Sequence, residues 1–553
     1  MSVVLSAVRS VVRTAMKAVP RPGPTARVAS ALAIIAAALG FAAWPPATAQ
    51  PLAPPGATSA ASAAADASRA AESDTMIWRA ASRLGYFPTP EITRAIRQHP
   101  RGAQGWALDE IDRAFEASRQ PARIPAQFSA LGSPLPTVFD EFRKDREARR
   151  KVEATPPKSD ASSMGRNDGQ PPAGPGAPFG LVTPVAGPAP FVRQIAQQAS
   201  AWRVLACSDA SVENPLLARL TEFWFNHLNV FIGKGTVRPF VGDYALSAIR
   251  PNVLGRYETL LLASARHPAM LFYLDQAQNV VDGSPGAKGV ARGINENYAR
   301  ELMELHTLGV DGGFAQKDVR ELARVLTGWT VDPFGSSGFR FVDRLHDQGE
   351  KTVLGQRFSA DGEREGMRAI AMLAEQPATA KRIARRLAQF FVTDDPKPAL
   401  IDRLAAEYTA GGGDLRRVMR ALVRSPEFWD PVNELFKTPY DFACSATAAS
   451  MQAGASNDGP RPRMALTLGF LASAGQPVNG WQTPDGYRTD AATWLSPEAL
   501  TRRADLAAAL AEGAGDPEYL MSFFSPATRE RLARAPVQSR AALALASPDF
   551  MRK

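Results

Sequence analysis

From position 191 onward, apolar residues recur with the 3.6-residue period of an amphipathic helix. This period predicts a long succession of helices. They are expected at residues 192–205, 215–231, 244–250, 254–266, 295–308, 316–327, 362–373, 378–391, 398–408, 415–424, 439–451, 464–474, 497–511 and 539–546. The stretch MIWRAASRLGYFPTPEITRAI predicts two more, the first stopped at Gly85 and the second opened by Pro90, and residues 105–118 continue helically.

Alternation typical of strands is confined to GFRFVDRLHDQGEKTVLG, residues 338–355, which predicts one β-hairpin. The predicted fold class is therefore mainly α, a multi-helix globular array with one small β-hairpin. The stretches ALVRSPEF and ALALASPDF, and more loosely ASARHPAM, repeat one pattern: an apolar helix end followed by Ser-Pro or His-Pro. Because proline disfavours the helical conformation in the residue before it, we interpret this pattern as a recurring helix stop.

The first 49 residues have the pattern of an export signal. A basic region ends at Arg27, a 16-residue apolar run follows, and Ala47-Thr48-Ala49 matches the small-x-small cleavage pattern. The alternative is an uncleaved membrane anchor, although the run is short for a membrane span. The sequence predicts an exported protein, periplasmic or extracellular, that contacts the membrane only through this segment if it stays uncleaved.

Composition divides the rest of the chain. Residues 50–75 form an Ala/Pro/Ser spacer, and residues 155–190 are rich in Pro and Gly, which favours a loop inserted between two helical parts at 76–154 and 191–553. A length of 553 residues predicts two or more packed units.

Charge and cysteine content limit the classes of protein to which the chain can belong. The formal charge is +9, but five of the 64 basic residues lie in the first 49, and removing them leaves 59 basic against 55 acidic residues, or +4. Such a balance gives no electrostatic reason to expect a nucleic-acid partner. The two cysteines, Cys207 and Cys444, either pair in an oxidising compartment or are two isolated buried thiols.

The stretch NENYARELMELH, residues 295–306, carries an unusual density of polar side chains. Glu301 and Glu304 are three residues apart on one helical face, where two carboxylates can share a proton or hold a divalent cation. On a helical wheel, His306 falls on the apolar side and Leu308 on the side of the two glutamates. The alternative is a structural ion-pair network, because Arg300 is spaced four residues from both Glu296 and Glu304.

Two other segments add candidates. RLHDQGEKTVLG places His346, Asp347 and Lys351 in one loop, where a scaffold can present reactive groups. EFWFNHLNVF places Trp224, Asn226 and His227 in an aromatic helix. The candidate catalytic residues are His306, His346, Asp347, Glu301 and Glu304. The candidate substrate-binding residues are Trp224, Asn226, His227, Asn297, Arg300, Trp329 and Lys351. The sequence contains no zinc-binding motif HExxH, no CxxC pair and no nucleophile-elbow motif GxSxG.

NENYARELMELHTLGVDGGFAQKDVRELARVLTGW, residues 295–329, resembles the signature of the bacterial family called domain of unknown function 1800. RLGYFPTPE, LTEFWFNHL, HPAMLFYLD, HDQGEKTVLG, RIARRLAQFFVTDDP and PDGYRTDAATWLSPEAL fit the same family in order. The resemblance implies an exported, mostly helical bacterial protein that often has a sulfatase-like exported protein as gene neighbour and possible partner. It implies no established reaction.

Two functional hypotheses follow. The first is an exported hydrolase acting on a cell-envelope or extracellular polymer. In it His346 is a general base or ligand oriented by Asp347 or a neighbouring carboxylate, and Glu301 and Glu304 share a proton or hold a cation. Trp224 and Trp329 form apolar walls that stack a sugar. The alternative is a non-catalytic helical scaffold or partner subunit of an exported complex, which the absence of standard catalytic motifs favours.

Overall fold

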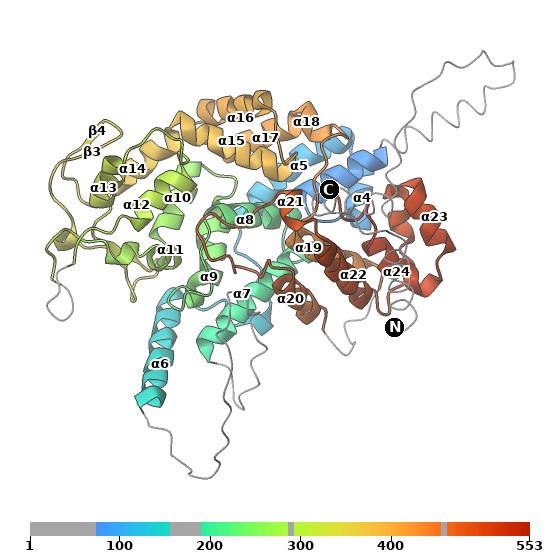
Figure 1. Cartoon of the computed structure of the whole chain (residues 1–553), viewed down its shortest axis with the longest axis horizontal. Coiled ribbons are helices and arrows are strands. Elements are labelled where there is room, and N and C mark those ends of the chain that lie inside the picture. The colour runs from blue at the N-terminus through green and yellow to red at the C-terminus, as the bar shows by residue number, and fades with distance from the viewer. Residues whose placement is uncertain (1–72, 155–189, 286–291, 455–461) are drawn as a thin grey trace, which may run out of the picture. The chain divides into compact units, whose positions relative to one another are not determined.

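The computed structural model describes residues 73–154, 190–285, 292–454 and 462–553 (Figure 1). The expected export signal, nearly all of the Ala/Pro/Ser spacer and the Pro/Gly-rich insertion lie outside these residues. Residues 73–84 are helical, so regular structure is present just before the position 76 at which the sequence predicted it. Among the described residues, no helix combines the length and the apolar character that crossing a membrane requires.

Helices dominate the described residues, which confirms the mainly α fold class. Besides the helix at residues 73–84, the described α-helices of eight or more residues are α4 (Pro90–Arg97), α5 (Gly102–Ser118), α6 (Leu135–Ala154), α7 (Phe191–Ser208), α8 (Pro215–His227), α10 (Tyr257–Arg266), α13 (Gln316–Val325), α14 (Glu363–Glu375), α15 (Pro377–Phe391), α16 (Pro398–Ala410), α17 (Leu415–Arg424), α19 (Pro439–Gln452), α20 (Arg463–Ser473), α22 (Pro497–Leu510), α23 (Pro526–Arg534) and α24 (Val537–Leu545). Most predicted helices agree with these bounds to within three residues, because each buries one apolar face.

The predicted helix stops are confirmed at all three positions: α24 ends at Leu545, just before Ser547 and Pro548, and at the other two positions a new helix follows the stop. α17 ends at Arg424, and the short helix α18 (Pro426–Trp429) begins after Ser425, whose side chain caps the new helix. α10 ends at Arg266, and α11 (Pro268–Tyr273) begins after His267, whose ring accepts a hydrogen bond from the Ala269 amide. In both new helices the proline occupies the first helical position, where its missing N–H has no intrahelical partner to lose.

Two small antiparallel hairpins replace the single one expected. β1 (Trp329–Val331) pairs with β2 (Phe339–Phe341), and β3 (Lys351–Val353) pairs with β4 (Gln356–Phe358). The predicted segment 338–355 thus supplies one strand of each hairpin. The segment does form strands, but each pairs with residues outside it: β2 pairs with β1 before the segment, and β3 pairs with β4 after it.

The described residues belong to one compact unit spanning 67–553, whereas the length predicted two or more. A chain of this length is too long for a single hydrophobic core, and its buried apolar residues fall into separate clusters. The largest joins α5, α8, α10 and the helices from α13 to α17, and a second joins α19, α20, α22 and α24. A disulfide between Cys207 and Cys444 connects α7 to α19. The open question of cysteine pairing is thereby answered in favour of a bond.

The polar stretch at residues 295–306 is not a regular α-helix. α12 (Asn297–Glu301) passes directly into a π-helical turn, η7 (Leu302–His306). A π turn is wider than an α turn and is frequent at functional sites. The helix ends at His306, so Leu308, expected on the side of the glutamates, lies outside it and is buried in the core.

Candidate functional site

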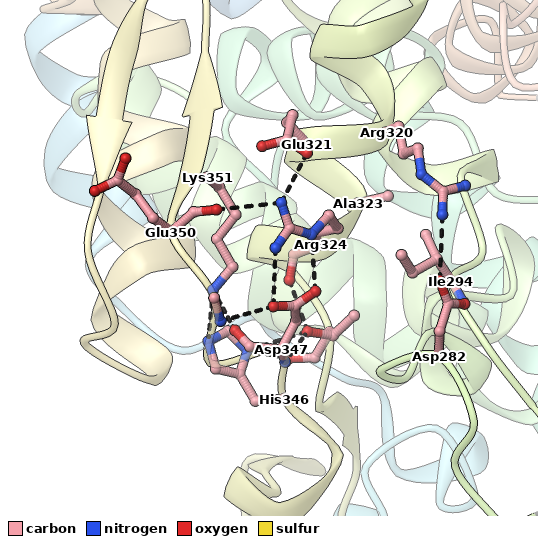
Figure 2. Close-up of polar contacts among 12 residues, drawn as sticks. Asp282, Ile294, Arg320, Glu321, Ala323, Arg324, His346, Asp347, Glu350 and Lys351 are labelled. Carbon is pink, nitrogen blue, oxygen red and sulfur yellow. Dashed lines mark hydrogen bonds and ion pairs between the residues drawn. The ribbon is translucent and has the colours of Figure 1, made fainter.

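His346 and Lys351 meet in a fully buried polar cluster at the start of the second hairpin (Figure 2). His346 Nε2 lies 3.1 Å and Lys351 Nζ 2.8 Å from the carboxylate of Glu365, a residue of α14. His346 Nδ1 lies 2.9 Å from the carbonyl oxygen of Thr327. Burial raises the pKa of Glu365, but the hydrogen bonds from His346 and Lys351 outweigh it and lower the pKa. His346, Lys351 and Glu365 therefore already have polar partners within the protein.

Asp347, the neighbour of His346, turns toward α13 instead. Its carboxylate accepts two hydrogen bonds from the Arg324 guanidinium, at 2.8 Å from Nε and 3.1 Å from Nη2 (Figure 2). Burial raises the pKa of Asp347, yet these bonds and one from the Gly349 amide bring it below its ordinary value. Asp347 therefore orients Arg324 and the loop, while His346 is oriented by Thr327 and Glu365.

His227 and His306 form a second buried group, with ring centroids 6.4 Å apart. His227 Nε2 lies 3.0 Å from the Tyr257 hydroxyl and 3.2 Å from the His306 carbonyl oxygen, to which that hydroxyl also donates. Burial, with a smaller contribution from Arg382, lowers the pKa of His306 to about 3, and burial lowers that of His227 well below its ordinary value. Among the described residues, neither ring nitrogen of His306 has a hydrogen-bond partner. Both rings are therefore neutral at neutral pH.

The two tryptophans expected to stack a sugar lie in the core. Trp224 is 1% exposed and its indole N–H donates to the Val253 carbonyl at 3.0 Å, and Trp329 is fully buried between Arg266 and Phe339. A ring needs an exposed face to stack a ligand, so this position does not suit the expected role.

Asn226 positions a loop. Its side chain donates to the Tyr487 carbonyl at 2.8 Å and accepts from the Tyr487 amide at 2.7 Å. Asn229 donates to the carbonyls of Trp481 and Thr483, and the Tyr273 hydroxyl donates to that of Gln482. These bonds fix the segment 476–487 against the end of α8. A small pocket lies between the two, with Asn226, Asn229 and Tyr487 among its lining residues.

The ion-pair alternative describes much of the polar stretch correctly. The Arg300 guanidinium lies 3.2 Å from Glu296 and 3.6 Å from Glu304, and it also donates to Gln316. Asn297 donates from its side chain to the Leu274 carbonyl at 3.2 Å. Three of the predicted residues, Glu304, Arg300 and Asn297, thus have structural partners.

Glu301 differs from its neighbours. It is half-buried, and its carboxylate has no hydrogen bond or ion pair with any described residue. Burial raises its pKa, and the nearby charges of Glu304 and Asp485 raise it further, against the opposing effect of Arg300. A half-buried carboxyl group whose pKa is raised by burial and by the charge of another carboxylate is the arrangement that acid–base chemistry uses.

Asp485 is the second carboxylate, and it sits in the loop that Asn226 holds. Its Oδ1 accepts hydrogen bonds from the Trp481 indole at 2.8 Å and from the Thr483 hydroxyl, and its Oδ2 has no partner among the described residues. Trp481 is only partly buried and packs on Tyr487 with ring centroids 4.9 Å apart. Glu301, Asp485 and Trp481 form what we call the Glu301 site.

The structure therefore brings together some predicted residues and separates others. His346 and Lys351 share one cluster, His227 and His306 another, and the contacts of the two clusters have no residue in common. Sequence reasoning missed Glu365 and Asp485, which reach these places through long-range packing. One signal was present, since Asp485 falls in PDGYRTD, a stretch that carries the family resemblance. Within the described parts of the chain, no group of three or more His, Cys, Asp or Glu side chains is arranged to hold a metal ion.

The described part of the chain is a mainly α array with a buried His–Lys–Glu cluster and, apart from that cluster, the half-buried Glu301 and the exposed Asp485. Residues 79–552 match the model of the family described as "Protein of unknown function (DUF1800)", and the chain belongs to that family. No curated protein matches it, and no solved structure does.

Proposed function

We propose that this protein is an exported hydrolase of a cell-envelope or extracellular polymer, with Glu301 and Asp485 as its acid and base. The observation that carries the proposal is the half-buried carboxyl group of Glu301, which has no hydrogen-bond or ion-pair partner among the described residues and whose pKa is raised by burial and by the charges of Glu304 and Asp485. The paired acids of the same stretch, Glu296 and Glu304, serve Arg300 instead.

The chemistry follows from the two environments. A raised pKa keeps Glu301 protonated over more of the pH range, so it can donate its proton to the leaving-group oxygen as the bond to that oxygen breaks. The partner-free Oδ2 of Asp485 can take a proton from the attacking water, whose oxygen forms the new bond. The proton on Asp485 then returns to solvent while Glu301 is reprotonated, so each cycle consumes one water.

Trp481 provides the wall that the sequence assigned to Trp224 and Trp329. Its indole N–H is held by Asp485, and its ring is partly exposed, so a sugar or other flat apolar face can stack there. The ring and the carboxylate are fixed to each other by one hydrogen bond. A ligand that stacks on the ring would therefore be oriented toward Asp485.

Two observations support export. The first 49 residues have the pattern of a signal segment, and Cys207 is bonded to Cys444. Disulfides persist in oxidising compartments such as the periplasm and the extracellular space.

The test compares Glu301→Gln with Glu304→Gln, a matched change three residues away on a carboxylate that has an Arg300 partner. The purified full chain is incubated with peptidoglycan sacculi and with soluble polysaccharides, and released fragments are quantified by mass spectrometry. We expect Glu301→Gln to lower the release rate about 100-fold or more, the usual contribution of a general acid, and Glu304→Gln to leave it within about threefold. No release by the wild-type protein, or equal release by both variants, would refute the proposal.

A second candidate is the non-catalytic scaffold, including a role as partner of a sulfatase-like exported protein. The pairing of His346 with Glu365, of Asp347 with Arg324 and of Arg300 with Glu296 favours it, because these contacts stabilise a fold without any ligand. The test is cross-linking in the native envelope followed by mass spectrometry. A partner-free monomer would contradict this candidate.

A further inference from the structure

Arg382 and Arg386 lie one turn apart on α15, so their side chains leave the same face of that helix. Arg382 Nε donates to the carbonyl of Leu305 at 2.9 Å, which joins this face of α15 to the π turn η7. Both arginines are near enough to His227 to lower its pKa. This face of α15 therefore borders the polar stretch that carries Glu301.

Arg386 has an unusual environment for a guanidinium. Its side chain is partly buried, and it has no hydrogen bond or ion pair with any described residue. Burial lowers its pKa to about 10, with Arg382 and Arg488 lowering it and Asp485 raising it, so the group is charged at neutral pH. A partly desolvated charge without a partner is unfavourable unless a ligand supplies the opposite charge.

The neighbouring charged side chains do not supply this opposite charge to Arg386. Arg488 already has Asp490 at 2.9 Å, and the Asp485 carboxylate is engaged by Trp481 and Thr483 at one oxygen. Arg382, one turn before Arg386, is bonded to the carbonyl of Leu305, four residues after Glu301, and the charge of Asp485 affects the pKa of both Glu301 and Arg386, so this guanidinium lies in the surroundings of the Glu301 site.

We propose that Arg386, supported by Arg382, binds an acidic group of the substrate, so that the Glu301 site acts on an acidic polysaccharide. This inference rests on the function proposed above. The planar fork of a guanidinium matches the two oxygens of a carboxylate, and Trp481, which is hydrogen-bonded to Asp485, offers a ring for a sugar face. The near-neutral balance of the chain beyond residue 49 favours an acidic glycan over a nucleic acid.

The chain offers a matched control, because Arg385 precedes Arg386 on the same helix and is exposed. Binding of polygalacturonate, of neutral dextran and of single-stranded DNA is measured by isothermal titration calorimetry with the Glu301→Gln chain, so that no polymer is cleaved. In this background we expect Arg386→Gln to weaken polygalacturonate binding about tenfold or more, and Arg385→Gln less than twofold. Dextran should bind more weakly than polygalacturonate and should not respond to Arg386→Gln.

The outcomes separate the two proposals. Equal effects of the two arginine changes, or binding of DNA that depends on Arg386 as strongly as that of polygalacturonate, would overturn the acidic-glycan inference even if Glu301 proved essential for hydrolysis. Arg386-dependent polygalacturonate binding without any Glu301-dependent hydrolysis would leave the binding site standing and refute the hydrolase. Circular dichroism of each variant shows that the fold is intact.

Discussion

Gly486 lies directly against the backbone of Asn226: a Cβ at position 486 would stand 2.1 Å from the Asn226 carbonyl oxygen. The Gly486 φ angle is +73°, a conformation that side chains other than glycine rarely adopt. Next to this contact, the Tyr487 amide donates a hydrogen bond to the Asn226 side chain, and the Tyr487 carbonyl accepts one from it. The loop that carries Asp485 and Trp481 is therefore fixed by close approach of two backbones.

We predict that Gly486→Ala destabilises the protein by about 2 kcal/mol or more, because both the clash and the φ angle oppose it. Gly469→Ala in α20 is the control, since a Cβ there meets nothing within 4 Å and alanine favours a helix. It should leave the free energy of unfolding unchanged or raise it by up to about 1 kcal/mol. Urea unfolding measures both, and equal stability of the two variants would show that the loop does not need glycine.

The helices could be predicted from the sequence because each one has its own apolar period. The details of residues 295–308 could not, since the change from α12 to the π turn η7 depends on packing of Leu302, Met303 and His306 in the core. A helical wheel placed Leu308 on the side of the glutamates, whereas the helix ends at His306, before that residue.

The candidate site was predicted in part. The sequence indicated Glu301, although within a larger set whose members, such as Asp347 and Arg300, have structural partners. Asp485 is 184 residues from Glu301 in the sequence, and nothing local in PDGYRTD indicates that an asparagine of α8 fixes its loop. Such contacts depend on tertiary packing, which periodicity does not encode.

His306 should make the stability of the protein depend on pH. Its pKa is about 3 in the folded protein and near the ordinary 6.5 when unfolded, so the unfolded chain binds the proton more readily. The contribution of neutral His306 is complete above pH 6.5 and is lost as the pH falls toward 3. Between pH 6.5 and 5 the loss is about 2 kcal/mol.

The measurement is urea unfolding of the wild type and His306→Leu at several pH values. The stability of the wild type relative to the variant should fall by about 2 kcal/mol between pH 6.5 and 5. His99→Gln is the control, because His99 lies apart from this group and contacts Asp109. A constant difference between wild type and His306→Leu across this range would mean that the ring takes up a proton in the folded state.

Lys351 and Glu365 should be strongly coupled, because both side chains are fully buried and 2.8 Å apart. Lys351→Met leaves the Glu365 carboxylate with His346 as its remaining side-chain partner, and we expect a loss of about 3–5 kcal/mol. Lys351→Met combined with Glu365→Gln should cost less than the sum of the two single changes. A double-mutant cycle by chemical unfolding measures this coupling, and Arg357→Gln, which breaks an exposed pair with Glu350 in the same hairpin, should have little effect. Strict additivity of the two buried changes would contradict direct pairing.

The disulfide between Cys207 and Cys444 should contribute substantially to stability, because it closes a loop of 237 residues between α7 and α19. Cross-linking residues so far apart restricts the unfolded chain. We therefore expect the free energy of unfolding of the Cys207→Ser/Cys444→Ser protein to be about 2–5 kcal/mol lower than that of the wild type. Adding dithiothreitol should lower the stability of the wild type and leave that of the double variant unchanged. Alkylation of unfolded, non-reduced protein with iodoacetamide, followed by mass spectrometry, should add no label to the wild type. Labelling of both cysteines without prior reduction would show that the thiols are free, and it would also remove one of the two observations that support export.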